Sequence, residues 1–307
     1  MLNRRAFSRN LAGAALGATA LSRPSQAAQT TSAATDNPNG TPFKISIMLW
    51  TVFKDLPFEE RLEKVVEAGY TNVELVGEYK KWSDDEFNRY NAKRKQLGIT
   101  FDTTAGLRHA VGNPADRDAM LADVRNELPI MEKLDCPAVI IMSGNVVPGM
   151  PRDTQHQSCI EGLKRAAAII EGKQINGQPV RLLLENIDPE ENPKYYLTSV
   201  AEGFEIIRAV NHPQVRFLYD FFHEQIAEGN LIEKLEKNID YTGLVHIADV
   251  PGRHEPGTGE IHYDNIYRKL AELKYDRMVA MEFLPTSDPV AKLRKAREDA
   301  LRMGASA

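Results

Sequence analysis

Residues 180–220 read VRLLLENIDPEENPKYYLTSVAEGFEIIRAVNHPQVRFLYD, and this stretch decides the fold. One apolar run stops at Glu185 and a second stops at Asp220. Between them, Ser199 and Glu202 have the spacing of a capping box, which predicts the start of a helix. A buried strand, a helix and another buried strand in succession predict two parallel strands joined by a helical crossover.

The same alternation extends along the chain from residue 43. Eight apolar runs alternate with amphipathic helical patterns, and the runs are 45–50, 72–76, 99–103, 138–142, 180–185, 215–220, 243–247 and 279–283. About 31 residues per strand-helix unit is the size expected of a (β/α)8 barrel. The sequence therefore predicts an α/β fold, a TIM barrel over residues 43–305, with a last helix starting at Pro289. A doubly wound open sheet is the alternative, but such a sheet concentrates its chemistry at one switch point.

Composition and charge narrow the class of protein. The 307 residues are 42% hydrophobic and 26% charged, which suits one large domain with a full core. A net charge of −5 argues against nucleic acid as a partner. The two cysteines, Cys136 and Cys159, lack the spacing of a zinc site. The sequence leaves the oligomeric state open, a homo-oligomer included.

The first 27 residues have the pattern of an export signal. Arg4 and Arg5 precede an apolar run over residues 11–21, and small residues follow up to Ala28. The paired arginines resemble a twin-arginine leader, so we expect export to the periplasm. The apolar run is too short for a stable membrane span, which needs about 20 residues. Residues 28–42 are small and polar with Pro and Gly, and they predict a flexible linker.

Four successive strand-like runs end at residues that can hold a hard metal ion: Glu185, Asp220, His246 and Glu282. Parallel barrel strands place their last residues around one mouth, so these side chains are expected to converge. Three carboxylates and one imidazole favour one divalent ion, Mn²⁺ or Mg²⁺, with Co²⁺ a further candidate. A single acid at a strand end is more often a helix cap or a rim ion pair, but four at one rim favour a metal site.

Such a site suits proton transfer on a small hydroxy-carbonyl compound or keto-sugar. A divalent ion stabilises the enediolate that forms when the carbon between two oxygens loses its proton. The carboxylates of Glu185 and Glu282 are the candidate acid/base pair. Around them, His223, Arg253 and Trp50 are candidate substrate-binding residues, with Arg253 offering a planar fork for oxygen atoms. An Arg253–Glu260 ion pair that only holds the loop is the alternative for that arginine.

The segment after the seventh run carries a resemblance to a known family. Residues 246–263 read HIADVPGRHEPGTGEIHY, and with Glu185, Asp220 and Glu282 they resemble the hydroxypyruvate isomerase branch of the xylose isomerase-like TIM barrel superfamily. The resemblance covers residues 43 to about 285. It implies that Glu185, Asp220 and Glu282 are metal ligands, that the two glutamates transfer protons, and that His223 and Arg253 contact substrate.

One position departs from that branch. The seventh-strand ligand is usually glutamine in the isomerases, whereas His246 stands here, as in the ketose 3-epimerases of the superfamily. The leading prediction is therefore a metal-dependent isomerase, with a ketose 3-epimerase as the alternative. A non-catalytic periplasmic sugar-binding barrel is a second alternative, which the retention of both Glu185 and Glu282 disfavours. The endonucleases of the superfamily use additional histidines and a basic surface, and this acidic chain lacks both.

Overall fold

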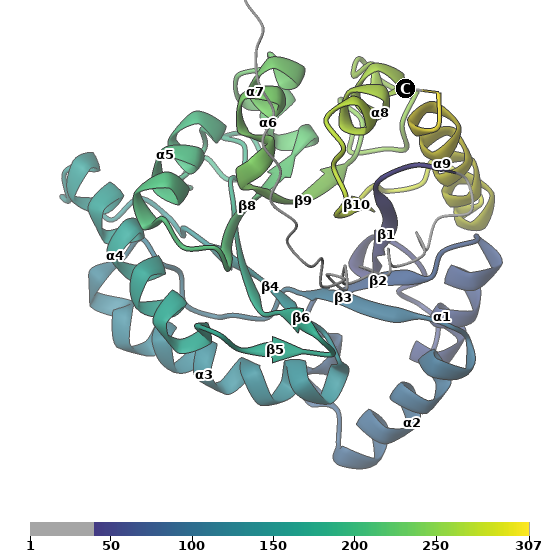
Figure 1. Cartoon of the computed structure of the whole chain (residues 1–307), viewed down its shortest axis with the longest axis horizontal. Coiled ribbons are helices and arrows are strands. Elements are labelled where there is room, and N and C mark those ends of the chain that lie inside the picture. Colours follow the sequence, from purple (N-terminus) through teal and green to yellow (C-terminus); the bar gives the residue numbers. More distant parts are fainter. Residues whose placement is uncertain (1–39, 307) are drawn as a thin grey trace, which may run out of the picture. The chain divides into compact units, whose positions relative to one another are not determined.

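The computed structural model describes residues 40–306, so the predicted export signal at 1–27 and most of the linker at 28–42 lie outside the described residues. Eight parallel strands close into a barrel in the order β1-β10-β9-β8-β7-β4-β3-β2, which confirms the predicted fold (Figure 1). The barrel strands are β1 (Lys44–Met48), β2 (Asn72–Leu75), β3 (Thr100–Thr104), β4 (Ala138–Met142), β7 (Arg181–Glu185), β8 (Val215–Asp220), β9 (Thr242–Ile247) and β10 (Met278–Met281).

Helices surround the barrel on its outer side (Figure 1). They are α1 (Phe58–Glu67), α2 (Asp84–Gln96), α3 (Arg117–Leu134), α4 (Arg152–Ile170), α5 (Val200–Val210), α6 (Phe221–Ala227), α7 (Leu231–Asn238), α8 (Tyr263–Glu272) and α9 (Pro289–Gly304). The last of these starts at Pro289 as predicted. Among the described residues, no helix combines the length and the apolar character that a membrane crossing requires.

Alternation along each strand creates two apolar layers. In β7, Leu182 and Leu184 belong to the large core between strands and helices, whereas Leu183 belongs to a smaller core inside the barrel. Side chains two residues apart share a face of a strand, so Glu185 lies on the same inner face as Leu183. The same rule places Asp220 above Leu218 and His246 above Leu244, both members of the inner core. The apolar pattern of the strands thus points these polar residues into the barrel.

Two strands end two residues earlier than predicted, and the other strand ends lie within one residue of the prediction. The first strand ends at Met48, and Trp50 lies in the short 3₁₀ helix η1 (Leu49–Thr51). The last strand ends at Met281, so Glu282 follows it by one residue, although the Glu282 N–H still donates to the carbonyl of Ile247 at 3.0 Å. In both places the apolar run continues past the last ladder pair, because the neighbouring loop also buries its side chains.

Two helices start at a Ser-x-x-Glu sequence, and their capping boxes differ in completeness. At α2 both hydrogen bonds are present between Ser83 and Glu86. At α5 the Ser199 hydroxyl accepts from the Glu202 N–H, but the Glu202 carboxylate accepts from Tyr196 and pairs with Arg152 instead. That helix start is therefore capped by one hydrogen bond and tied to α4 by the other side chain.

Candidate active site

The four predicted metal ligands converge. Glu185, Asp220, His246 and Glu282 are all buried, and each offers one ligand atom within 4.8 Å of the others. Strand register explains this, because Asp220 of β8 pairs with His246 of β9, and Glu185 of β7 pairs with the neighbouring β8. Four ligand atoms from four strand ends at this spacing match the predicted metal site.

Asp220 is held by its own helix. It is the N-cap of α6, and its Oδ1 accepts from the N–H of Phe222 at 2.7 Å and of His223 at 3.4 Å. Those bonds satisfy two of the free donors at the helix start and fix the carboxylate. Its second oxygen, Oδ2, remains available to the centre of the cluster.

The hydrogen bonding of His246 prepares it to bind a cation. Its Nε2 lies 3.0 Å from Oε2 of Glu74, a fully buried carboxyl group that holds the imidazole in place. Its Nδ1 lies 2.7 Å from Oε2 of Glu282, which Arg253 Nη2 also approaches at 2.6 Å. Burial lowers the pKa of His246, but the charges of Glu74 and Glu282 prevail and raise it well above its usual range, so a proton on the imidazole balances these carboxylates, and a cation in its place would bind the same Nδ1 and Oε2 atoms. The residues present therefore fit a divalent ion.

The two glutamates have opposite electrostatic environments. Burial raises the pKa of Glu185 to about 8, and the nearby charge of His246 only partly opposes this. Burial also acts on Glu282, but Arg253, His246 and the hydrogen bond from Trp50 outweigh it and hold the pKa of Glu282 well below its usual range. Pairs of carboxyl groups whose pKa values are driven apart are a common feature of acid/base sites.

The Arg253 side chain contacts the cluster of predicted metal ligands and not the acidic residues of its own loop. Its Nη2 lies 2.6 Å from Oε2 of Glu282 and 3.3 Å from Oδ2 of Asp220. The guanidinium also lies over the rings of Trp50 and Phe222. The Arg253–Glu260 ion pair considered from the sequence does not form, because the Glu260 carboxylate accepts from Gln225 instead.

His223 and Trp50 also reach the site. His223 Nδ1 lies 2.6 Å from Oδ2 of Asp188, and its Nε2 lies 3.5 Å from Oδ2 of Asp220. Burial lowers the pKa of His223, but the charges of Asp220 and Asp188 prevail and raise it to about 9. Trp50 donates its indole N–H to Oε1 of Glu282 at 2.7 Å. This contact fixes the carboxylate and places the indole at the wall of the site.

A cavity of about 310 Å³ opens beside these residues. One wall is polar and contains Glu185, Glu191, His223, Arg253 and Glu282. The facing wall, from the first four strands and their loops, is apolar and consists of Met48, Val76, Ala105, Leu107, Ile140 and Met142. Trp50 and Ile187 also line the cavity, and its charged and imidazole side chains all come from β7 onward.

Two functional candidates went unassigned in the sequence. Glu74 contacts Nε2 of His246 and orients the imidazole. Glu191 lies 3.1 Å from Arg253 Nη1 and lines the cavity. The sequence signal for Glu191 was weak, because it stands in an acidic loop where most such side chains are solvated. His109, which follows β3, contacts Asp123 and is not part of the cluster.

Replacement of Glu74 by glutamine tests the orienting role. We expect metal affinity to fall about 10- to 100-fold, the range for loss of a carboxylate that holds a metal-binding histidine. Isothermal titration with Mn²⁺ measures this. The matched control is Glu60→Gln, an exposed site on α1. Equal Mn²⁺ affinity in the Glu74→Gln variant and the parent would contradict the assigned role.

Comparisons with known proteins agree with this fold. A family model described as xylose isomerase-like TIM barrel matches residues 62–303. The 2-oxo-tetronate isomerase of Pectobacterium atrosepticum is 31% identical over 246 residues, covering 79% of this chain and 92% of the relative. The hydroxypyruvate isomerase of Escherichia coli is 28% identical over 262 residues, covering 82% and 97%.

Solved structures show the same barrel. AP endonuclease, family 2, from Brucella melitensis superposes with a TM-score of 0.72 at 26% identity, covering 81% of this chain and 96% of the other. D-psicose 3-epimerase from Clostridium cellulolyticum H10 gives 0.66 at 20% identity, covering 86% and 96%. This chain belongs to the xylose isomerase-like TIM barrel family, which confirms the resemblance identified from the sequence.

Proposed function

We propose that this protein is a metal-dependent isomerase of a small hydroxy-carbonyl compound, of which hydroxypyruvate and 2-oxo-tetronate are the model substrates. The observation that carries the proposal is the convergence of Glu185, Asp220, His246 and Glu282 beside a cavity. The names of the two curated relatives support the reaction class.

In this proposal the four residues hold Mn²⁺ or Mg²⁺, with Co²⁺ as a further candidate. When bound, the ion supplies positive charge that stabilises the two negative oxygens of an enediolate. One of the two glutamates removes a proton from the hydroxyl-bearing carbon beside the carbonyl. The other returns a proton to the former carbonyl carbon, the hydroxyl proton passes to the former carbonyl oxygen, and the product is an isomer of the substrate.

Arg253, His223 and Trp50 position the reactants. The guanidinium of Arg253 and the imidazole of His223 face the cavity and donate to substrate oxygens. Trp50 holds the Glu282 carboxylate through the 2.7 Å hydrogen bond, so this group meets the substrate in one orientation. The apolar wall has no partner for hydroxyl groups far from the reacting carbons, which favours a short substrate over a hexose.

A ketose 3-epimerase is the second candidate, and His246 in the seventh-strand position favours it. An epimerase returns the proton to the same carbon from the opposite face, so the same two glutamates serve both reactions. Incubation with D-psicose separates the candidates, because an epimerase converts it to its C3 epimer and a small-substrate isomerase leaves it unchanged.

The test is proton exchange with solvent. Protein loaded with Mn²⁺ is incubated with hydroxypyruvate in D₂O, and NMR follows deuterium entry at the hydroxyl-bearing carbon. We expect exchange together with isomer formation. A non-catalytic sugar-binding barrel would bind such compounds without exchange. No exchange across hydroxypyruvate, 2-oxo-tetronate and D-psicose would contradict the proposal.

We also propose that the protein is exported through the twin-arginine route, on the basis of Arg4, Arg5 and the short apolar run that follows. Fractionation of producing cells measures the location. Periplasmic protein that lacks the first 27 residues supports export, and full-length protein confined to the cytosol contradicts it.

A further inference from the structure

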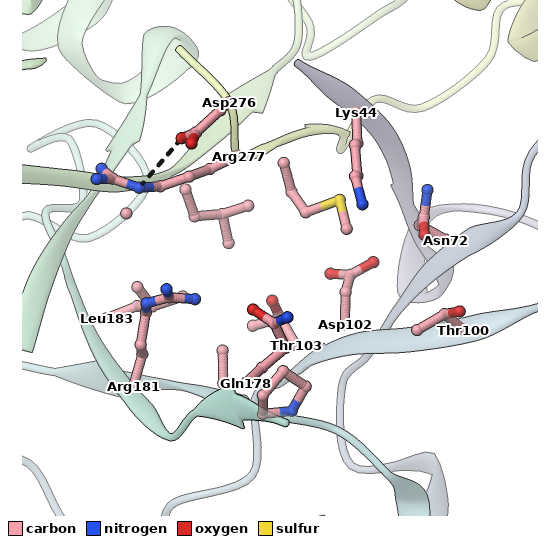
Figure 2. A pocket seen from close by; sticks show the side chains of 15 residues that line it. Lys44, Asn72, Thr100, Asp102, Thr103, Gln178, Arg181, Leu183, Asp276 and Arg277 are labelled. Atoms are coloured by element: carbon pink, nitrogen blue, oxygen red, sulfur yellow. Dashed lines mark ion pairs between the residues drawn. The ribbon is translucent and has the colours of Figure 1, made fainter. Parts of the chain in front are cut away.

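The barrel has a second cavity at the end opposite to the metal-binding cluster (Figure 2). Its volume is about 410 Å³, and residues that open strands line it, including Lys44 of β1, Asn72 of β2, Arg181 of β7 and Met278 of β10. Parallel strands bring their first residues to one mouth and their last residues to the other. The proposed isomerase mechanism uses no residue of this second mouth.

The alternation of side chains along β7 directs the side chain of Arg181 into this cavity. Arg181, Leu183 and Glu185 alternate along β7 and share its inner face. Leu183 belongs to the inner apolar layer, so Arg181 lies on one side of that layer and Glu185 on the other. An arginine is ordinarily directed to solvent, and its place on the inner face of a barrel strand is therefore unusual.

Two guanidinium groups bring positive charge to this mouth. Arg181 and Arg277 line the cavity together with Lys44, which lies on another side of it (Figure 2). Within residues 40–306, the Arg181 guanidinium has no hydrogen-bond or ion-pair partner. Arg277 donates from Nη1 to the carbonyl of Thr242 and pairs with Asp276 at 3.8 Å, where the Asp276 side chain is 80% exposed. An exposed pair at that distance neutralises little charge.

The positive charges of the guanidinium groups also repel one another. Burial lowers the pKa of Arg181, and the charge of Arg277 lowers it further. Arg216, on the adjacent strand β8, lies outside the lining of the cavity and donates to the carbonyls of His212 and Val215 at 3.3 Å each. The two like charges of Arg181 and Arg277 are stabilised when an anion lies between them.

The rest of the lining is mostly neutral, and it includes Asn72, Thr100, Thr103 and Gln178. Gly243 is closely packed, because a Cβ there would lie 2.5 Å from Cβ of Arg216 and 2.7 Å from the Leu183 side chain. Asp102 is the one buried carboxyl group of the lining, and its Oδ1 has no hydrogen-bond partner. Burial and the charge of Glu74 raise the pKa of Asp102 well above its usual range. A protonated Asp102 adds a hydrogen-bond donor and no competing charge.

We propose that this cavity binds an oxyanion, the phosphate or carboxylate group of a small metabolite, between Arg181 and Arg277. A guanidinium donates two parallel hydrogen bonds to either group. The cavity is larger than an inorganic phosphate, so the metabolite carries further atoms toward the neutral amides of Asn72 and Gln178.

The test is anion binding measured by isothermal titration calorimetry on the whole protein. Inorganic phosphate and malonate are titrated separately at constant ionic strength, with chloride as the control for screening. The variants are Arg181→Gln and, as a matched control, Arg125→Gln at an exposed site on α3. We expect phosphate or malonate to bind the parent and Arg125→Gln with similar dissociation constants, and Arg181→Gln at least about tenfold more weakly. The tighter of the two anions identifies the group that the cavity takes.

Two controls separate this cavity from the active site and from misfolding. Anion affinity must persist in Arg253→Ala, which removes the guanidinium of the metal-binding cluster. If Arg181→Gln fails to fold, Arg181→Lys keeps the charge but loses the fork, and we expect it to bind the anion more weakly than the parent. Binding no stronger than chloride, unchanged binding after loss of Arg181, or binding abolished by Arg253→Ala would each overturn the proposal. None of these outcomes depends on the isomerase activity.

Discussion

Replacement of Glu185 or Glu282 by glutamine is expected to lower kcat by about 10²- to 10⁴-fold, the contribution of a positioned acid or base. Glutamine keeps the size of the side chain and an oxygen that can bind a cation, but it cannot exchange a proton. Both residues lie at the rim of the inner apolar layer and outside the large core, so we expect the unfolding midpoint to change little.

Single-turnover kinetics with hydroxypyruvate measures this effect, and metal content is determined for each variant. Glu132→Gln, an exposed site on α3, is the matched control and should retain full activity. Activity within a factor of two of the parent in either the Glu185→Gln or the Glu282→Gln variant refutes the acid/base assignment. A variant that loses both metal and activity reports on binding alone, so the assignment is tested with variants that keep the ion.

Removal of the metal is the second large effect. We expect chelation to lower activity by two orders of magnitude or more, roughly the several kcal/mol that a cation contributes to charge stabilisation. The melting temperature should fall as well, because an ion that binds only the folded state stabilises it by mass action.

Addition of Mn²⁺ to the chelated protein should restore both activity and melting temperature. The control is Asp220→Ala, which loses a ligand and should gain little from added Mn²⁺. Chelated protein that remains fully active would show that the four buried side chains work without a cation.

The sequence predicted the barrel and its ligand set because both follow from local alternation. An apolar run of the VRLLLE type fixes which residues face inward, and the parallel topology then fixes where the strand ends meet. The positions of Glu185, Asp220 and His246 follow from these two patterns alone. Their convergence was therefore predictable from single-chain patterns.

Contacts between loops were harder to predict, since they depend on chain paths that no periodicity encodes. Arg253 adopts a positive φ of 56° within its loop and reaches Glu282, 29 residues away in the chain. Trp50 reaches the Glu282 carboxylate from η1, directly after the first strand. No periodic pattern in the sequence indicates either of these two contacts with Glu282.

Other features were missed although a signal existed. The hairpin of β5 (Gln174–Ile175) and β6 (Gln178–Pro179) turns at Asn176-Gly177, both with positive φ. Asn-Gly between two short extended segments is a strong hairpin signal. The alternation of Arg181 with Leu183 and Glu185 is a second such signal, because it indicates an arginine inside the barrel.

The most direct test of the metal centre is a crystal of the protein soaked in Mn²⁺ and examined by anomalous diffraction. We expect one strong peak per chain, within about 2.0–2.6 Å of one atom each from Glu185, Asp220, His246 and Glu282. A peak elsewhere, or no peak at a Mn²⁺ concentration that supports activity, would contradict the account.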